Sequence, residues 1–119
     1  MPTLLWQNPN TTLGATTISI PTLKNYRYME IWVSVVEQAS CIINKFTTDD
    51  GSNKLICNGL NRDTISDTDK LRWMNFMTRG FTVSGTNITF ESGQMQYYGA
   101  IYKDWNNRCV PFRIYGLLF

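Results

Sequence analysis

The acidic residues that could do chemistry in this chain lie mainly in one polar segment. Asp63, Asp67 and Asp69 follow the spacing D-x-x-x-D-x-D within residues 61–70, and Asp49-Asp50 form a second, smaller group. This spacing lacks the central glycine and the terminal bidentate glutamate of a calcium-binding loop. Aspartates in polar stretches form turns more often than metal sites, so we expect a solvated loop here.

This sequence lacks several of the side chains that enzymes most often use for catalysis. The 119-residue chain has no histidine, which removes histidine acid–base catalysis, Ser-His triads and the commonest metal ligand. Cys41, Cys57 and Cys109 lack metal-ligand spacing and are odd in number, so we expect reduced, mostly buried thiols, with one disulfide plus a free thiol as the alternative. We therefore expect no enzyme, cofactor or metal, and we rank a hydrolase using the three aspartates of residues 61–70 third among the functions.

An aromatic cluster towards the end of the chain offers binding chemistry instead. Tyr97, Tyr98, Trp105 and Asn106 could stack on a sugar ring and hydrogen-bond its hydroxyl groups. Such residues more often pack in a core or at a strand edge, and both interpretations stay open. The first interpretation makes a stand-alone carbohydrate-binding module the alternative function.

Charge and hydropathy argue against nucleic acids and membranes as partners. Basic and aromatic residues interleave in a pattern that could bind single-stranded nucleic acid, at Arg72, Trp73, Arg79, Arg113 and Tyr115. The net charge of +2 is too small to drive such attachment. No apolar run approaches the length of a membrane span, and Met1-Pro2-Thr3 lacks the features of a secretion signal. We expect neither partner, and synthesis in a reducing cytoplasm.

Period-two alternation predicts that strands must position these residues. Apolar residues make up 43% of the chain, charged residues 17% and aromatic residues 13%, a mixture that suits half-buried strands. We expect strands over residues 4–9, 16–20, 28–36, 42–46, 54–57, 79–84, 87–91, 100–102 and 110–119, with a turn over 47–53. Seven to nine short strands indicate an all-β, antiparallel β-sandwich, jelly-roll-like, with residues 1–10 as an arm or first strand and 11–119 as a single domain.

One hairpin is predicted in register. Gly85-Thr86 separates two alternating runs, and glycine at the first central position suits a type II′ turn. A two-residue loop then places Phe81 opposite Phe90, Val83 opposite Ile88 and Thr82 opposite Thr89. Cross-strand pairs of this kind contribute about 0.2–1 kcal/mol each.

Two expected strands carry large apolar groups on both faces, namely residues 28–36 and 71–77. A strand that is apolar on both faces is covered on both faces. A central strand or an overlying loop explains this as well as a subunit interface does, and we lean towards the interface because large apolar patches are unusual on monomers. Trp32, Trp73 and Phe76 are the candidate interface residues.

The ordered segments resemble a small β-sandwich module found in structural proteins of tailed bacteriophages and prophages, of the tail, tail-fibre or head-fibre type. The resemblance rests on Leu5-Trp6-Gln7-Asn8-Pro9, the threonine-rich run 15–20, and residues 26–36, 78–84, 88–90 and 110–116. It implies a non-enzymatic virion protein, a decoration or fibre module mounted on head or tail. It also implies a homo-oligomer, favouring a trimer, with other virion proteins and a host-surface glycan as partners.

Overall fold

The computed structural model describes residues 2–34, 41–48, 51–55, 75–97, 100–104 and 106–118. Within these residues the chain forms nine β-strands and one short 3₁₀ helix. The elements are β1 (Thr3–Gln7), β2 (Thr16–Ser19), η1 (Leu23–Asn25), β3 (Tyr28–Ser34), β4 (Cys41–Phe46), β5 (Gly51–Leu55), β6 (Asn75–Ser84), β7 (Asn87–Tyr97), β8 (Ala100–Tyr102) and β9 (Val110–Leu117).

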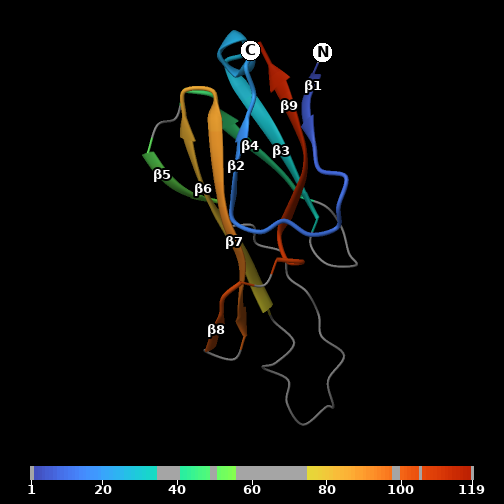
Figure 1. Cartoon of the computed structure of the whole chain (residues 1–119), viewed down its shortest axis with the longest axis vertical. Helices are drawn as coiled ribbons and strands as arrows, with labels where there is room; N and C mark the ends of the chain where they lie inside the picture. Colours follow the sequence, from blue (N-terminus) through green and yellow to red (C-terminus); the bar gives the residue numbers. More distant parts are fainter. Residues whose placement is uncertain are drawn as a thin grey trace.

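The strands form two antiparallel sheets that pack as a β-sandwich, so the predicted fold class is confirmed. Sheet A has the order β1-β9-β3-β4, and sheet B has the order β2-β7-β6-β5 with β8 paired to β7. Figure 1 shows β1, β9 and β3 in one layer and β5, β6 and β7 in the other. The first strand pairs with the last and the second with β7, which gives the chain its jelly-roll-like wrapping.

The predicted hairpin register is confirmed. Phe81 pairs with Phe90, Val83 with Ile88 and Thr82 with Thr89. Gly85 has φ +62°, whereas the positive-φ non-glycine residues of the described chain are Asp104 and Cys109. The turn therefore has a positive φ only at its first central position, as a type II′ turn requires.

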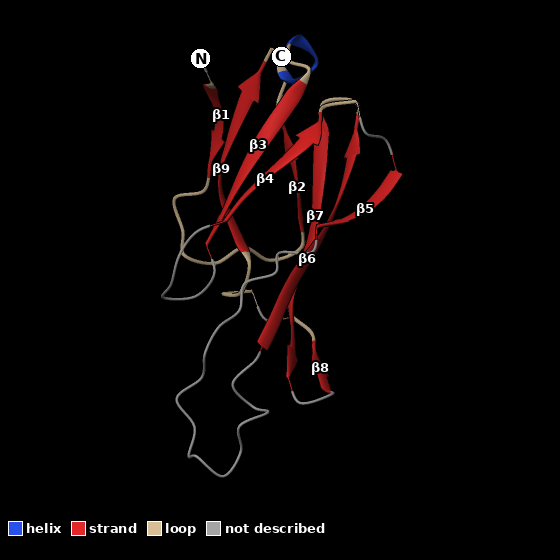
Figure 2. Ribbon diagram, turned by 180° about the vertical axis from the view of Figure 1, so that it is seen from behind, coloured by secondary structure: helices blue, strands red, loops and turns tan. Residues whose placement is uncertain are grey.

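The hairpin is longer than its sequence pattern predicts, because β6 begins at Asn75 and β7 ends at Tyr97. A register shift between Arg79 and Phe81 marks a bulge in the middle of the hairpin. Figure 2, the view from behind, shows that β6 and β7 extend with β8 beyond one end of the strands of sheet A.

One strand begins earlier than expected. The turn predicted over 47–53 gives way to β5 at Gly51, since residues 51–53 pair with Val83, Thr82 and Phe81 of β6. Pairing with a strand distant in sequence overrides the local turn preference of Gly-Ser-Asn. The strand predicted over 28–36 is described as far as Ser34.

The core lies between the sheets and follows the predicted alternation. Met29, Ile31 and Val33 of β3 are buried, as expected for one face of that strand. From sheet B, buried residues that include Phe81, Val83, Ile88 and Phe90 join the same cluster. Each fully buried side chain of this size stabilises the fold by about 1.5–3 kcal/mol relative to exposure.

A buried arginine ties together the turns at one end of the core. Arg79 is 1% exposed. Its Nε donates to the Cys109 carbonyl (2.8 Å), Nη1 to the Leu13 and Glu91 carbonyls (2.7 Å each), and Nη2 to the Arg108 carbonyl (3.1 Å) and, at longer range, the Asn106 carbonyl (3.4 Å). Arg79 is therefore unavailable to nucleic acid. Its inclusion among the basic residues that could bind single-stranded nucleic acid was wrong.

Asn8 shapes the segment that follows β1. Its Oδ1 accepts from the Asn10 backbone N–H (2.9 Å), and its Nδ2 donates to the Thr12 and Pro111 carbonyls (3.2 Å each). This Asx-type turn redirects the chain and fixes it against β9. Asn10 and Thr11 are thereby held beside the start of β9.

Candidate functional site

The outer side of sheet A is the surface on which apolar residues gather. Along β3, Tyr28, Glu30, Trp32 and Ser34 alternate with the buried residues and are half-buried, as predicted for the second face of this strand. Directly opposite residues of neighbouring strands share a face. Phe46, Asn44 and Ile42 of β4 therefore lie on this side, as do Leu117 and Tyr115 of β9 and, opposite Tyr115, Leu4 of β1.

We call this surface the aromatic face. It comprises Leu4, Tyr28, Trp32, Ile42, Phe46, Phe112, Tyr115 and Leu117, drawn from all four strands of sheet A. Phe112 belongs to it because β9 bulges at that point and its ring meets Trp32. Leu4, Ile42 and Phe46, on the two edge strands, are exposed by 48%, 50% and 48%.

The rings of the aromatic face hold one another in place. The Trp32 and Tyr115 ring centroids are 5.2 Å apart, and Phe112 meets Trp32 edge-on at 6.2 Å and 81°. Tyr28 and Phe46 form a second pair at 4.7 Å. Such tilted and edge-on pairs contribute about 0.5–1.5 kcal/mol each beyond the area they bury. The rings are thus positioned before any partner arrives.

Polar and basic groups accompany the rings. The Arg27 guanidinium lies 5.6 Å from the Tyr28 ring centroid, and the Arg113 guanidinium 5.8 Å from that of Phe112. Glu30 and Asn44 pair across β3 and β4, between the two ring groups. Aromatic residues and arginine are the residue types enriched at protein–protein interfaces.

The aromatic face contains a hollow of about 310 Å³ lined by Tyr28, Glu30, Asn44 and Leu117. Its lining combines one carboxylate and one amide with two apolar side chains. A long side chain of a partner with a polar or cationic end would fit such a lining, with its stem against Tyr28 and Leu117 and its end at Glu30.

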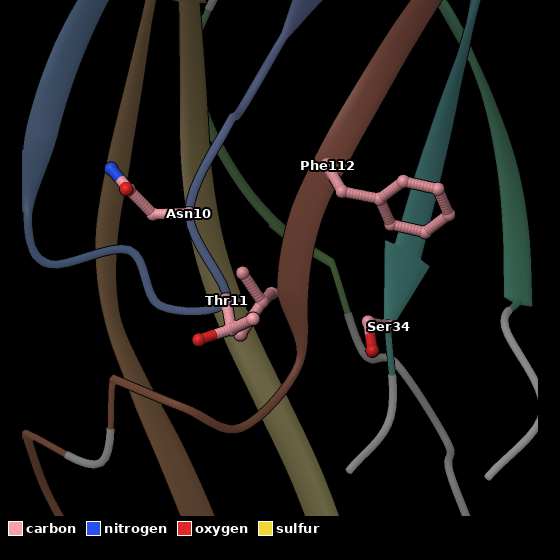
Figure 3. A pocket seen from close by; sticks show the side chains of 5 residues that line it. Asn10, Thr11, Ser34 and Phe112 are labelled. Carbon is pink, nitrogen blue, oxygen red and sulfur yellow. The ribbon is translucent and has the colours of Figure 1, made fainter. Parts of the chain in front are cut away.

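A second pocket lies beside Phe112. It has a volume of about 250 Å³ and is lined by Asn10, Thr11, Ser34, Val110 and Phe112. Figure 3 shows Phe112 and Ser34 on β9 and β3, with Asn10 and Thr11 on the segment that follows β1. This pocket therefore depends on the Asx-type turn at Asn8.

Two of the three candidate interface residues lie in described strands, one in each sheet. Trp32 lies in the aromatic face and is half-buried, and its buried Nε1 has no acceptor among the described residues. Phe76 lies in β6 of sheet B, in the other layer of the sandwich. Trp73 lies outside the described residues.

The candidate glycan residues are described only in part. Tyr97 pairs with Ala100 where β7 meets β8, whereas Tyr98 and Trp105 lie outside the described residues. Asn106 is half-buried, and its carbonyl accepts from the Leu13 backbone N–H (3.0 Å). It thus helps to fix the turn around Arg79.

Most of the acidic residues and cysteines considered as chemical groups lie outside the described residues. Asp49-Asp50 and the aspartates of residues 61–70 lie outside the described residues, as does Cys57, while Cys109 is buried and free. The described parts of the chain contain no group of three or more His, Cys, Asp or Glu side chains that could hold a metal ion. No helix in those parts is long and apolar enough to cross a bilayer.

The class of protein that these observations define is a β-sandwich module with an aromatic outer face. Neither a scan of the sequence against models of known protein families nor a search of curated proteins gives a match.

Proposed function

We propose that this protein is a non-enzymatic structural module that docks onto another protein of a bacteriophage particle through its aromatic face. The observation that carries the proposal is the gathering of eight aromatic and aliphatic side chains on the outer side of sheet A. The resemblance to tail and fibre modules supplies the setting, a decoration or fibre component mounted on head or tail.

The aromatic face suits docking for energetic reasons. Tryptophan, tyrosine and arginine are the residues that most often dominate binding energy at interfaces. Trp32 and Tyr115 are already fixed by their mutual contact. Binding them therefore costs less side-chain entropy than ordering flexible groups would.

Glu30 supports a protein as the occupant. A purely apolar surface would not fix the orientation of a bound partner. The Glu30 carboxylate, which lines the hollow, selects a partner side chain with a hydrogen-bond donor or positive charge. We propose that a lysine or arginine of the neighbouring virion protein enters this hollow.

The test is quantitative mass spectrometry of purified particles from the phage that encodes the chain. The proposal expects the chain at a fixed ratio to the major capsid or tail protein, retained through density-gradient purification. Its presence in infected cells but absence from purified particles would contradict the proposal.

A stand-alone carbohydrate-binding module is the second candidate, favoured by the pocket beside Phe112. The lining of this pocket includes one aromatic residue, Phe112, and three polar residues, Asn10, Thr11 and Ser34, and sugars are bound by rings and hydrogen-bonding groups together. This candidate expects binding on a glycan array that Phe112→Ala abolishes and Thr17→Ala, on the other sheet, leaves intact. A blank array for the folded protein would remove it.

A further inference from the structure

The outer edge of sheet A offers a second mode of association. β4 is the last strand of sheet A, and its ladder partner in the described chain is β3. Such an edge strand presents a row of backbone N–H and C=O groups to any strand that approaches it. Many proteins blunt such edges with charges. β4 carries one charge, Lys45, and its positions on the outer face of the sheet include Ile42 and Phe46, exposed by 50% and 48%.

We infer that β4 pairs antiparallel with β4 of a second copy, about a two-fold axis that passes midway between the two copies of Asn44. This register places Ile42 opposite Phe46 of the partner subunit, and by symmetry the reverse. Two half-exposed apolar side chains thereby cover each other at both ends of the new ladder. Asn44 meets its own symmetry mate at the centre, where amide side chains can hydrogen-bond across the axis.

The neighbouring registers are less favourable. Directly opposite residues share a face, so a two-fold axis perpendicular to the sheet must pass midway between a residue and its own copy in the partner strand. Centring on Ile43 would place Ile42 opposite Asn44 of the partner subunit. Phe46 would then extend past the start of the partner's β4 and have no opposite residue in that strand. Centring on Lys45 would place two lysines directly opposite each other, and like charges in that position destabilise a pair.

The inference goes beyond the proposed function, because it specifies self-association through an edge rather than docking through a face. Pairing about this axis joins two copies of sheet A into one continuous sheet and leaves both aromatic faces on the same side. It gives a dimer, in place of the trimer that the resemblance to fibre proteins implies. A single edge strand buries less than the roughly 800 Å² per partner of a standard interface, so we expect weak association.

Disulfide trapping tests the register directly. The parent carries Cys41→Ser and Cys57→Ser, and retains Cys109 because it is buried. The Asn44→Cys variant would bring the two Cα atoms to about 4.5–5.5 Å, which is within disulfide range. In the matched Ile42→Cys variant, the two copies of residue 42 would be offset by four positions, or about 13 Å along the ladder, and should not cross-link.

A mixture of the Ile42→Cys and Phe46→Cys variants should cross-link as a mixed pair under the same mild oxidant, whereas each alone should stay monomeric. Thermal melts of every variant verify that it is folded. Equal cross-linking of the Asn44→Cys and Ile42→Cys variants, or no cross-linking of the former or of the mixture, would overturn the inference.

A charge substitution separates this edge from the rest of sheet A. Phe46→Lys in the Asn44→Cys background should reduce cross-linking at least tenfold. Leu4→Lys, at the opposite edge and with the same exposure of 48%, should leave cross-linking unchanged. Equal loss in both would overturn the edge assignment. Retention of the chain on particles is measured separately, so failure of edge pairing is distinguishable from failure of face docking.

Discussion

Replacing Arg79 by methionine should destabilise the protein severely, because the buried guanidinium donates to backbone carbonyls that are themselves buried or partly buried. Arg79→Met preserves much of the side chain's length but removes every donor. Four of its hydrogen bonds, to the carbonyls of Leu13, Glu91, Arg108 and Cys109, are 3.1 Å or shorter. At about 1 kcal/mol per hydrogen bond, the four contribute about 4 kcal/mol.

Two opposing effects bracket this value. Methionine removes the desolvation penalty of a buried cation, which would stabilise the variant if the carbonyls were also replaced. The carbonyls remain, and each buried acceptor without a donor is itself unfavourable. We therefore expect a loss of about 3–5 kcal/mol, a large share of the roughly 5–15 kcal/mol by which domains are stable.

Urea denaturation followed by tryptophan fluorescence measures this loss as a difference in the free energy of unfolding. Arg79→Lys should cost about half as much, because one ammonium cannot reach carbonyls on three separate segments. Arg27→Met is the matched control: Arg27 is exposed and stacks on Tyr28, so its loss should cost at most about 1 kcal/mol. An Arg79→Met protein within 1 kcal/mol of wild type would refute the proposed role of the guanidinium.

Three further substitutions test local features. Gly116→Ala should destabilise the fold by about 1–3 kcal/mol in urea melts, because the added Cβ would lie 2.6–2.8 Å from the Tyr26 ring. Gly14→Ala is its control, since the added Cβ would meet Asn106 at an ordinary 3.6 Å. Gly85→Ala should cost about 1 kcal/mol in a thermal melt through the strain of its positive φ. Asn8→Ala should cost about 1–3 kcal/mol by removing the Asx-type turn, and an unchanged melting temperature would contradict that assignment.

Local features of the fold were predictable from the sequence. The register of the β6–β7 hairpin follows from its two-residue turn, and the two faces of β3 follow from alternation. Both depend on residues within a few positions of one another. The start of β5 was not predictable in this way, because its first residues extend along Val83, Thr82 and Phe81 of a later strand.

The candidate site was predictable only at Trp32. Phe112 and Tyr115 come beside Trp32 because β9 lies between β1 and β3, and no local pattern specifies that neighbour order. Arg79 was misjudged for a similar reason. An arginine is buried only where enough acceptors converge, and here the acceptors come from turns distant in the sequence.

We propose above that the aromatic face holds this protein on a bacteriophage particle. The most direct measurement is the copy number per particle of a phage that carries Leu4→Asp, in the aromatic face but away from the β4 edge, compared with one that carries Thr17→Asp on the exposed side of sheet B. We predict that the first substitution lowers the copy number at least tenfold while the second leaves it at the wild-type value. Wild-type copy number in the Leu4→Asp particles, with the variant protein shown to be folded, would contradict this proposal.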